Sequence, residues 1–453
     1  MKNKRRIKLS TTHIIMIGFL AVILAGSLLL ALPVSSATGK AVPYLDALFT
    51  AATSTCVTGL VTLPVISTWS PFGQAIILVM IQIGGLGVVT VISCVMISLH
   101  RKLGISDRLL LQDAFNLSSI SGIVRFTKKV AAGTLIIEGI GALGYMTVFV
   151  PEFGLKGVWI SIFNAVSAFC NAGIDIVSTN SLCDYALNPM INMTTCMLII
   201  LGGLGFIVWW DVIRVLRDFR KLKGRCLRKL TLHSKIVLST TAVLLAAGTI
   251  AILVFEYDNP GTIGSYALGG KLEVSFFQSV TTRTAGFATI PQQGLRNSSA
   301  VVCLLLMFIG GSPVGTAGGV KTVTIAVLLA SIVSAIKNKN EVVLFNRRIA
   351  RQTVGKAVAV TGMSFLIMFI STVLLSATTQ ADILDILYEA VSATATVGLT
   401  RNLTPSLNAF GKMIVIATMY LGRIGPISLA VAFNTRKQSE NIIKEPTEEV
   451  SVG

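Results

Sequence analysis

Charged side chains are scarce in this chain. Only 13% of its 453 residues are aspartate, glutamate, lysine or arginine, whereas a soluble domain carries about a quarter. So few charges cannot cover the surface of a folded protein in water. The composition therefore excludes an ordinary soluble globular protein.

Clusters of histidine and cysteine are also lacking. The three histidines stand alone at the borders of apolar runs, and the seven cysteines show no paired spacing. Metal sites and disulfide frameworks need such residues at close, regular spacings. We therefore expect no metal centre, no disulfide framework and no covalently bound cofactor.

Long apolar runs are abundant. Eight of them approach or exceed the roughly 20 residues that a helix needs to cross a bilayer. We predict spans at Ile14–Leu32, Ala75–Leu99, Ala131–Val150, Met190–Val212, Ile236–Phe255, Ala300–Val333, Ala357–Ala377 and Met413–Phe433. The first run follows basic residues and could be mistaken for a signal peptide. We interpret it as a span, because removing it would break the alternation of charge described next.

The net charge of +18 is distributed unevenly along the chain. Most of the 38 lysines and arginines lie in the N-terminal tail, in the connections 101–129, 214–235 and 337–356, and in the C-terminal tail. Such a bias over alternate short loops marks the cytoplasmic side of a membrane protein. Both termini are thus predicted to be cytoplasmic. The basic loops are expected to attract anionic membrane lipid, and we expect no nucleic-acid partner.

A fourfold internal repeat is the strongest pattern. A stretch of about fifteen residues ending in glycine lies between each odd-numbered span and the next, and the four glycines follow one another at intervals of 112 to 114 residues. An aromatic residue stands ten positions before each glycine, and a bulky apolar residue follows it. The glycines are Gly59, Gly173, Gly286 and Gly398; the aromatics are Phe49, Phe163, Phe276 and Tyr388; the apolar residues are Leu60, Ile174, Phe287 and Leu399.

The repeat indicates one structural unit used four times. Fifteen helical residues span only about 22 Å, so each stretch must enter the membrane, turn and leave on the same side. Non-helical backbone is tolerated at that depth only inside protein or beside a watery cavity. We predict an all-α integral membrane protein of four pseudo-fourfold helix–pore loop–helix repeats, with eight transmembrane helices and four re-entrant pore helices. The repeats occupy residues 1–100, 101–218, 219–340 and 341–434, and 435–453 form a cytoplasmic tail.

Carbonyl oxygens from four such loops would surround a common centre and could replace the hydration shell of a monovalent cation. Thr396-Val397-Gly398 resembles part of a potassium-channel filter, and Val57-Thr58-Gly59 is similar in character. Four unequal filter segments in one chain resemble the Trk/Ktr/HKT superfamily of potassium transporters, and eight spans in about 450 residues resemble its Ktr type, whose membrane subunits are KtrB and KtrD. The alternative for the glycines is ordinary close helix packing, which does not explain their common register.

The resemblance implies that the filter is lined by the backbone carbonyls of three residues in each segment. These are Val57, Thr58 and Gly59; Asn171, Ala172 and Gly173; Thr284, Ala285 and Gly286; and Thr396, Val397 and Gly398. Some related sodium-selective transporters have serine at the first glycine position, so Gly59 favours potassium. Each segment holds one glycine of this kind, against two in a potassium channel, which implies a shorter filter.

A gate is predicted from a second glycine-rich cluster, which lies 24 to 29 residues after each filter glycine. We interpret the first two clusters, Gly84–Gly87 and Gly202–Gly205, as close helix packing. The third is too rich in glycine and proline for a continuous helix. In Ktr transporters the matching region is an intramembrane loop that obstructs the pore, and the resemblance carries that role to Gly310, Gly311, Ser312, Pro313, Val314, Gly315, Thr316, Ala317, Gly318, Gly319 and Val320. Residues 315–322 also look faintly like a nucleotide-binding loop, but Val320 replaces a required glycine and no strand precedes it.

Arg423, in the fourth cluster (Gly422–Pro426), lies deep in the last span. An arginine there is costly and marks a functional site. We expect it to form a positive barrier below the filter or to bond to carbonyls of the gate loop, the alternative being a buried salt bridge such as one with Glu138. Arg283 is expected at the outer end of its pore helix. The outer loops carry more acidic than basic residues, which predicts a cation-attracting vestibule or simply solvated loops.

These patterns together predict potassium uptake and no enzymatic activity. The resemblance implies a homodimer, a cytoplasmic ring of nucleotide-binding subunits of the KtrA or KtrC kind, and sodium as an activator, in a bacterial cytoplasmic membrane. The first alternative is a sodium or non-selective cation channel. The second is a proton-coupled carrier or membrane-embedded enzyme, for which Glu138 is the one suitable intramembrane acid.

Overall fold

The computed structural model describes residues 11–99, 104–114, 121–217, 229–339 and 341–425. Within these ranges the chain is helical except for its connections and one short antiparallel pair, β1 (Val343–Leu344) and β2 (Arg347–Arg348). The predicted all-α class is thereby confirmed. The two tails, Pro426 and the end of the last predicted span lie outside the described residues.

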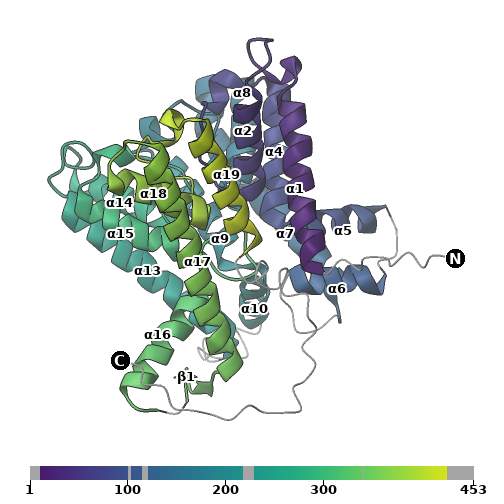
Figure 1. Cartoon of the computed structure of the whole chain (residues 1–453), viewed down its shortest axis with the longest axis vertical. Helices are drawn as coiled ribbons and strands as arrows, with labels where there is room; N and C mark the ends of the chain where they lie inside the picture. Colours follow the sequence, from purple (N-terminus) through teal and green to yellow (C-terminus); the bar gives the residue numbers. More distant parts are fainter. Residues whose placement is uncertain (1–10, 100–103, 115–120, 218–228, 340, 426–453) are drawn as a thin grey trace.

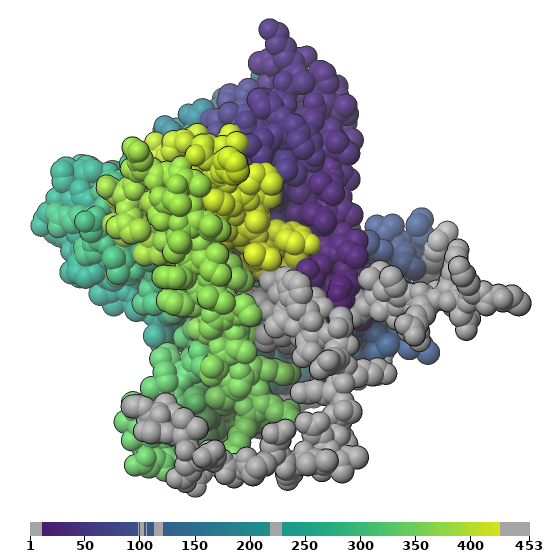
Figure 2. All heavy atoms as spheres, in the orientation of Figure 1, coloured from purple at the N-terminus to yellow at the C-terminus, as the bar shows by residue number. Residues whose placement is uncertain are grey.

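Four long apolar helices form the outside of the molecule (Figure 1). They are α1 (Thr11–Leu30), α7 (Ile123–Phe153), α13 (Leu232–Glu256) and α17 (Arg351–Thr378), each long and apolar enough to cross a membrane. All four expose large apolar side chains, such as Leu135 on α7 and Phe365 on α17. Figure 2 shows α17, in green, standing along one side of the visible face, and α1, in purple, along the other. Apolar surface on this scale suits a lipid environment rather than water.

A shorter helix follows each long one and packs against it. These helices are α2 (Tyr44–Cys56), α8 (Leu155–Cys170), α14 (Leu268–Thr281) and α18 (Ile383–Ala395). Their C-terminal halves are buried almost without exception. They are too short to span a bilayer, and their burial satisfies the requirement that a chain reversing inside a membrane be surrounded by protein.

One aromatic of the repeat is out of register. Phe49, Phe163 and Tyr388 are fully buried, as their shared position predicts, but Phe276 is 38% exposed and the next residue, Phe277, is buried instead. The helix α14 ends at Thr281, five residues before its glycine, whereas α2, α8 and α18 each end three residues before theirs. The third unit therefore unwinds earlier than the other three, and its side chains are displaced.

A third group of helices completes each unit. It comprises α4 (Pro71–Leu86), α9 (Pro189–Leu204), α15 (Asn297–Phe308) and α19 (Ala409–Ile424). Side chains of Ser70, Asn188 and Asn408 cap α4, α9 and α19 by accepting bonds from backbone N–H groups of the first turn, which is the preferred chemistry for starting a helix. Smaller elements lie in the connections between these helices: α3 (Val65–Thr68), α6 (Ile105–Ala114), and 3-10 turns at Pro33–Ser35, Cys183–Tyr185, Gln292–Gly294 and Thr404–Ser406.

The prediction of continuous spans at 75–99 and 190–212 is wrong. After α4 the chain turns by 99° at Gly87 into α5 (Val88–Ser98), and after α9 it turns by 99° at Gly205 into α10 (Phe206–Arg217). Both glycines have φ near +87° and ψ near +140°, as does Gly425 after α19, a conformation that residues with a Cβ avoid. The third unit breaks differently, with residues 309–321 separating α15 from α16 (Thr322–Ile336).

Candidate ion pathway

The short helices are followed by backbone of left-handed conformation, which is unusual for three of the four residues involved. Val57, Asn171 and Thr396 follow α2, α8 and α18 with φ of +56°, +59° and +51°. Thr284, after α14, has φ of +66°. Positive φ is a genuine outlier for β-branched residues, and such strain persists where the surrounding structure holds it in place. All four residues stand two positions before a predicted filter glycine.

The four filter glycines also have positive φ, between +63° and +100°. One residue lies between each strained position and its glycine, and none of these four intervening residues has a positive φ. They are Thr58, Ala172, Ala285 and Val397. Backbone that alternates in hand turns successive peptide groups toward the same side. Each segment therefore presents neighbouring carbonyl groups in one direction.

The glycines form a closed ring in which no side chain fits. A Cβ atom on Gly59 would lie 2.5 Å from the carbonyl oxygen of Ala172 in the second segment. The same relation takes Gly173 to Ala285, Gly286 to Val397, and Gly398 back to Thr58. Segments more than a hundred residues apart in the sequence thus meet in cyclic order, and the residues that the sequence analysis assigned to the filter lie together.

Hydroxyl groups of the short helices hold the filter backbone in place. The N–H groups of Gly59 and Gly398 each donate to a hydroxyl six residues earlier, Thr53 Oγ1 and Ser392 Oγ, at 3.0 Å in both cases. In the second segment Ser167 Oγ accepts from the N–H of Ile174 instead. The first and fourth segments, which most resemble a potassium filter, are therefore also anchored in the same way.

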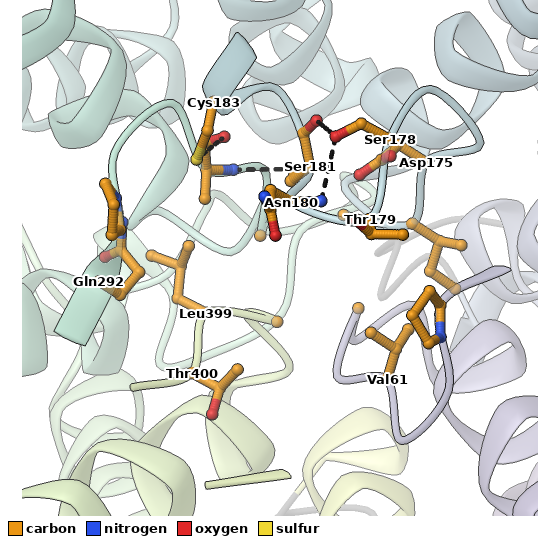
Figure 3. Close-up of a pocket in the computed structure, with 18 of the residues that line it drawn as sticks. Val61, Asp175, Ser178, Thr179, Asn180, Ser181, Cys183, Gln292, Leu399 and Thr400 are labelled. Carbon is orange, nitrogen blue, oxygen red and sulfur yellow. Dashed lines mark hydrogen bonds between the residues drawn. The ribbon is translucent and has the colours of Figure 1, made fainter. Parts of the chain in front are cut away.

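A cavity of about 440 Å³ opens on one side of the ring. Its floor includes all four filter glycines, and its walls are loops that follow them (Figure 3). Most of the labelled wall residues, such as Ser178, Asn180 and Thr400, are polar and uncharged. Asp175 is the one acidic residue among those that line the cavity in the described chain, and burial raises the pKa of its carboxyl to about 6.

Several of the outer acidic residues that the sequence analysis considered for a vestibule have local partners instead. Asp46 bonds to Lys412 and Asp385 to Arg401, as ion pairs. Glu256 and Glu389 are buried and accept hydrogen bonds from threonine hydroxyls, Thr262 at 2.7 Å and Thr400 at 2.6 Å. These contacts favour a structural role for them, and the charge facing the cavity comes from Asp175.

The predicted gate loop, residues 310–320, is unwound as expected. Its ends pair with each other, the N–H of Gly310 donating to Val320 O at 3.0 Å. Its middle is tied to the end of α9, since the N–H groups of Ser312 and Thr316 donate to Gly203 O and Gly202 O. The loop contacts residues that precede the filter glycines, whereas the cavity is lined by the glycines and residues after them. The loop and the cavity therefore lie on opposite sides of the ring.

Arg423 joins three units below the ring. Its guanidinium donates to Thr316 O of the gate loop at 2.7 Å and to Gly84 O at the end of α4 at 2.5 Å. The predicted bonding to loop carbonyls is therefore present. The alternative, a salt bridge with Glu138, is wrong, because Glu138 instead accepts a hydrogen bond from Gln82.

Lys321 also lies at this site, although it was not predicted to belong to the gate. Its ammonium group donates to Ala317 O at 2.6 Å, one residue from the carbonyl that Arg423 holds. Neither cation has an acidic partner within the described chain. A lysine inside the apolar run 300–333 could have indicated a functional residue. Its proximity to Arg423 could not be predicted without the fold.

Arg283 also lies elsewhere than predicted. It follows the C-terminal end of α14, the end nearest the filter, and donates to Gly310 O at 3.4 Å. The prediction of a position at the outer end of the helix is therefore wrong. Since the third segment unwinds two residues early, Arg283 is directed toward the base of the gate loop.

Packing accounts for part of the other glycine clusters; the packing predicted for the first two applies to Gly84 and Gly202, whereas Gly87 and Gly205 form the bends. A Cβ atom on Gly84, Gly202 or Gly422 would collide with a backbone oxygen at the end of the short helix of the same unit, Thr55 O, Phe169 O and Thr394 O respectively. These glycines therefore allow the inner helices to lie directly against the filter supports.

Comparison with known proteins agrees with this geometry. Residues 3–445 match the model of the TrkH family, described as cation transport proteins. The chain is 39% identical to the Ktr system potassium uptake protein B of Bacillus subtilis, covering 99% of this chain and 98% of that protein. It is 37% identical to the potassium/sodium uptake protein NtpJ of Enterococcus hirae, over 100% and 99% of the two chains.

A solved structure has the same fold. The crystal structure of the potassium transporter TrkH from Vibrio parahaemolyticus superimposes with a TM-score of 0.74 at 16% identity, covering 96% of this chain and 87% of that one. The predicted membership of the Trk/Ktr/HKT superfamily is confirmed, as is the expectation of a transporter rather than an enzyme. The chain belongs to the TrkH family of cation transport proteins.

Proposed function

We propose that this transporter takes up potassium ions through the ring formed by Gly59, Gly173, Gly286 and Gly398. The observation that carries the proposal is the cyclic contact of each glycine with the carbonyl before the next glycine. Uncharged carbonyl oxygens that face a common centre can replace the water around a dehydrated cation. The names of the relatives point to the same ion, although one of them includes sodium.

The proposed membrane architecture is four pseudo-fourfold units, each with an outer helix, a re-entrant short helix and an inner helix. Their proposed limits are 1–100, 101–218, 219–340 and 341–434, with a cytoplasmic tail at 435–453. Eight transmembrane segments then place both termini on the cytoplasmic side of the bacterial cell membrane. The positive charge of alternate connections supports this orientation, and the apolar outer faces of α1, α7, α13 and α17 support their placement in lipid.

The proposed gate is the loop 310–320 together with Arg423. The loop lies on the side of the ring away from the cavity, and two cations, Arg423 and Lys321, hold two of its neighbouring carbonyls. Positive charge in a low-dielectric site repels a cation that leaves the filter. Ion passage then requires that the loop and its cations move aside.

The proposed function also involves partner proteins and lipid. We expect a homodimer in which each chain has its own pore, surrounded by membrane lipid. Opening is expected to depend on a cytoplasmic ring of nucleotide-binding subunits, with sodium acting as an activator. The basic connections on the cytoplasmic side are the candidate surfaces for docking that ring.

Flux into liposomes that contain the purified protein, with and without a nucleotide-binding ring subunit, tests the function. We expect uptake of potassium to exceed uptake of sodium when no proton gradient is present. Equal uptake of both ions would support the alternative of a non-selective channel, and faster sodium uptake a sodium channel. Transport only in the presence of a proton gradient would overturn the pore and favour a carrier.

A further inference from the structure

We propose that Thr316 is a selectivity-determining positioning residue, because its hydroxyl ties the gate loop to the second filter segment. The inference rests on the proposed function and extends it: the loop that closes the pathway also supports the filter. It follows from contacts between segments that are about 145 residues apart in the chain.

The hydroxyl of Thr316 bridges two groups at the end of α8. It donates to Phe169 O at 3.0 Å and lies 3.0 Å from Asn171 Oδ1. Thr316 is fully buried and Asn171 is 1% exposed, so water does not compete for either contact. Within the described residues, no other side chain of the loop bonds to a filter segment.

Asn171 transmits this contact to the ion pathway. It is the left-handed residue that ends α8, and asparagine is among the few residues that adopt this conformation readily. The next residue is Ala172, whose carbonyl oxygen lies against Gly59 of the neighbouring segment in the ring. A shift of the Asn171 side chain therefore moves a carbonyl that the proposed filter uses.

The third segment has a backbone tie to the same loop. The N–H of Gly318 donates to Thr284 Oγ1 at 3.2 Å, again at the left-handed residue of that segment. Two of the four filter segments are thus bonded to the loop, at equivalent positions. In the first segment this position is Val57, whose side chain has no hydrogen-bonding group.

The other side of Thr316 is held by Arg423, through the backbone carbonyl. One residue therefore connects the proposed gate cation to the filter, so displacing the loop must also release Asn171. A loop that only obstructed the pathway would need no such bond. If the loop supports the filter, Thr316 controls the selectivity between potassium and sodium. If the loop only obstructs the pathway, Thr316 controls the total flux.

The experiment measures potassium and sodium flux for full-length protein in liposomes. Thr316→Val removes the hydroxyl at nearly constant volume, and we expect the ratio of potassium to sodium flux to fall about threefold to tenfold, the range expected for one lost hydrogen bond. Thr316→Ser keeps the hydroxyl and should restore the ratio. The matched control is Thr322→Val, which breaks a bond to Ser312 within the third unit and should leave the ratio unchanged.

An unchanged ratio in Thr316→Val, with both fluxes raised equally, would overturn the inference and leave the loop as an obstruction alone. A fall of the same size in Thr322→Val would also overturn it, since the effect would then be general. If Thr316→Val does not fold, Thr316→Ala removes the hydroxyl without adding atoms and gives the same comparison. A wild-type protein that does not prefer potassium would contradict the proposed function itself, which separates the two failures.

Discussion

At Gly59 a side chain has two separate costs. The backbone has φ of +96°, and a Cβ atom would lie 2.5 Å from Ala172 O. The positive φ strains only the backbone of residue 59 itself. The clash with Ala172 O displaces a neighbouring filter segment. Only the second should affect which ion passes, because it moves a carbonyl oxygen of the ring.

Comparing serine at Gly59 with serine at Gly39 separates these two effects. We expect Gly59→Ser to lower the ratio of potassium to sodium flux by about fivefold or more, corresponding to roughly 1 kcal/mol of displaced backbone. The control is Gly39→Ser, since Gly39 also has positive φ, +69°, but has open space around its Cβ position. Equal ratios in Gly59→Ser and wild type would contradict the ring as the site of selection.

Asp175 should make uptake depend on pH. Because burial raises the pKa of its carboxyl to about 6, the group is charged at pH 7.5 and mostly neutral at pH 5. Loss of the one acidic charge that lines the cavity should reduce potassium entry roughly twofold to tenfold at low ionic strength. Flux should therefore fall with a midpoint near pH 6.

Asp175→Asn should remove that pH dependence and keep uptake low throughout. Asp258, an exposed residue that does not line the cavity, provides the control variant Asp258→Asn. The stability of the fold changes with pH because the pKa of Asp175 is raised by folding. This raised pKa stabilises the folded protein fully below the ordinary pKa of aspartate, and the contribution is lost as the pH rises through 6. Asp175→Asn should thus raise the melting temperature at pH 7.5 relative to wild type.

At the scale of elements, hydrogen bonds tie the gate loop to several helices. Its ends pair with each other, its middle bonds to α9, and Arg423 links it to α19 and α4. Removing the arginine side chain would leave buried carbonyls without donors. Hydrogen bonds to a charged group are worth about 1.5–3 kcal/mol.

Arg423→Gln should raise leak of potassium through liposome-reconstituted protein about tenfold or more. The reason is that both the positive barrier and the bond to Thr316 O are lost. Arg348→Gln, which removes an exposed surface pair with Glu341, should leave the leak at the wild-type level. Lower or unaltered leak in Arg423→Gln would count against the gate.

Gly202 tests the packing of α9 on α8. A Cβ atom there would collide with Phe169 O, and backbone cannot yield as a side-chain tip can, so Gly202→Ala should destabilise the protein by roughly 1–3 kcal/mol. Gly362→Ala, in the interior of α17 with nothing within 4 Å, should be neutral or stabilising by up to about 1 kcal/mol. Thermal unfolding in detergent measures both, and equal melting temperatures would refute the packing role.

Long apolar helices were the easiest elements to predict. The spans expected at 14–32, 131–150, 236–255 and 357–377 are the outer helices α1, α7, α13 and α17, because hydrophobic length is a local property. The bends at Gly87 and Gly205 were not predicted. An apolar glycine-rich stretch is compatible with a straight helix, and only the backbone φ distinguishes the two.

At the scale of the whole molecule, the four units are similar but not equivalent. Three inner helices end at a glycine of similar conformation, whereas the third unit has a loop. The early unwinding of α14 and the contact of Arg283 with Gly310 belong to the same unit. The asymmetry places the proposed gate on one side of an otherwise cyclic filter.

Growth of a potassium-uptake-deficient bacterium tests the assembled system. We expect the chain, expressed with a cytoplasmic nucleotide-binding ring subunit, to restore growth at low potassium, and to do so better when sodium is present. The control is the Gly59→Ser variant expressed to the same level. Rescue that is independent of both sodium and the ring subunit would refute the proposed regulation while leaving the pore intact.

The sequence by itself determined the membrane class, the fourfold register of the glycines and the existence of a short buried helix before each one, because these depend on hydrophobic length and on the repeat; the early end of α14 was decided by the fold. Only the tertiary structure decided that each glycine faces the carbonyl before the next one, that Arg423 bonds to Thr316 rather than Glu138, and that Thr316 reaches Asn171. These contacts join segments more than a hundred residues apart. Local patterns cannot specify which distant groups meet, since that depends on how four units close around one centre.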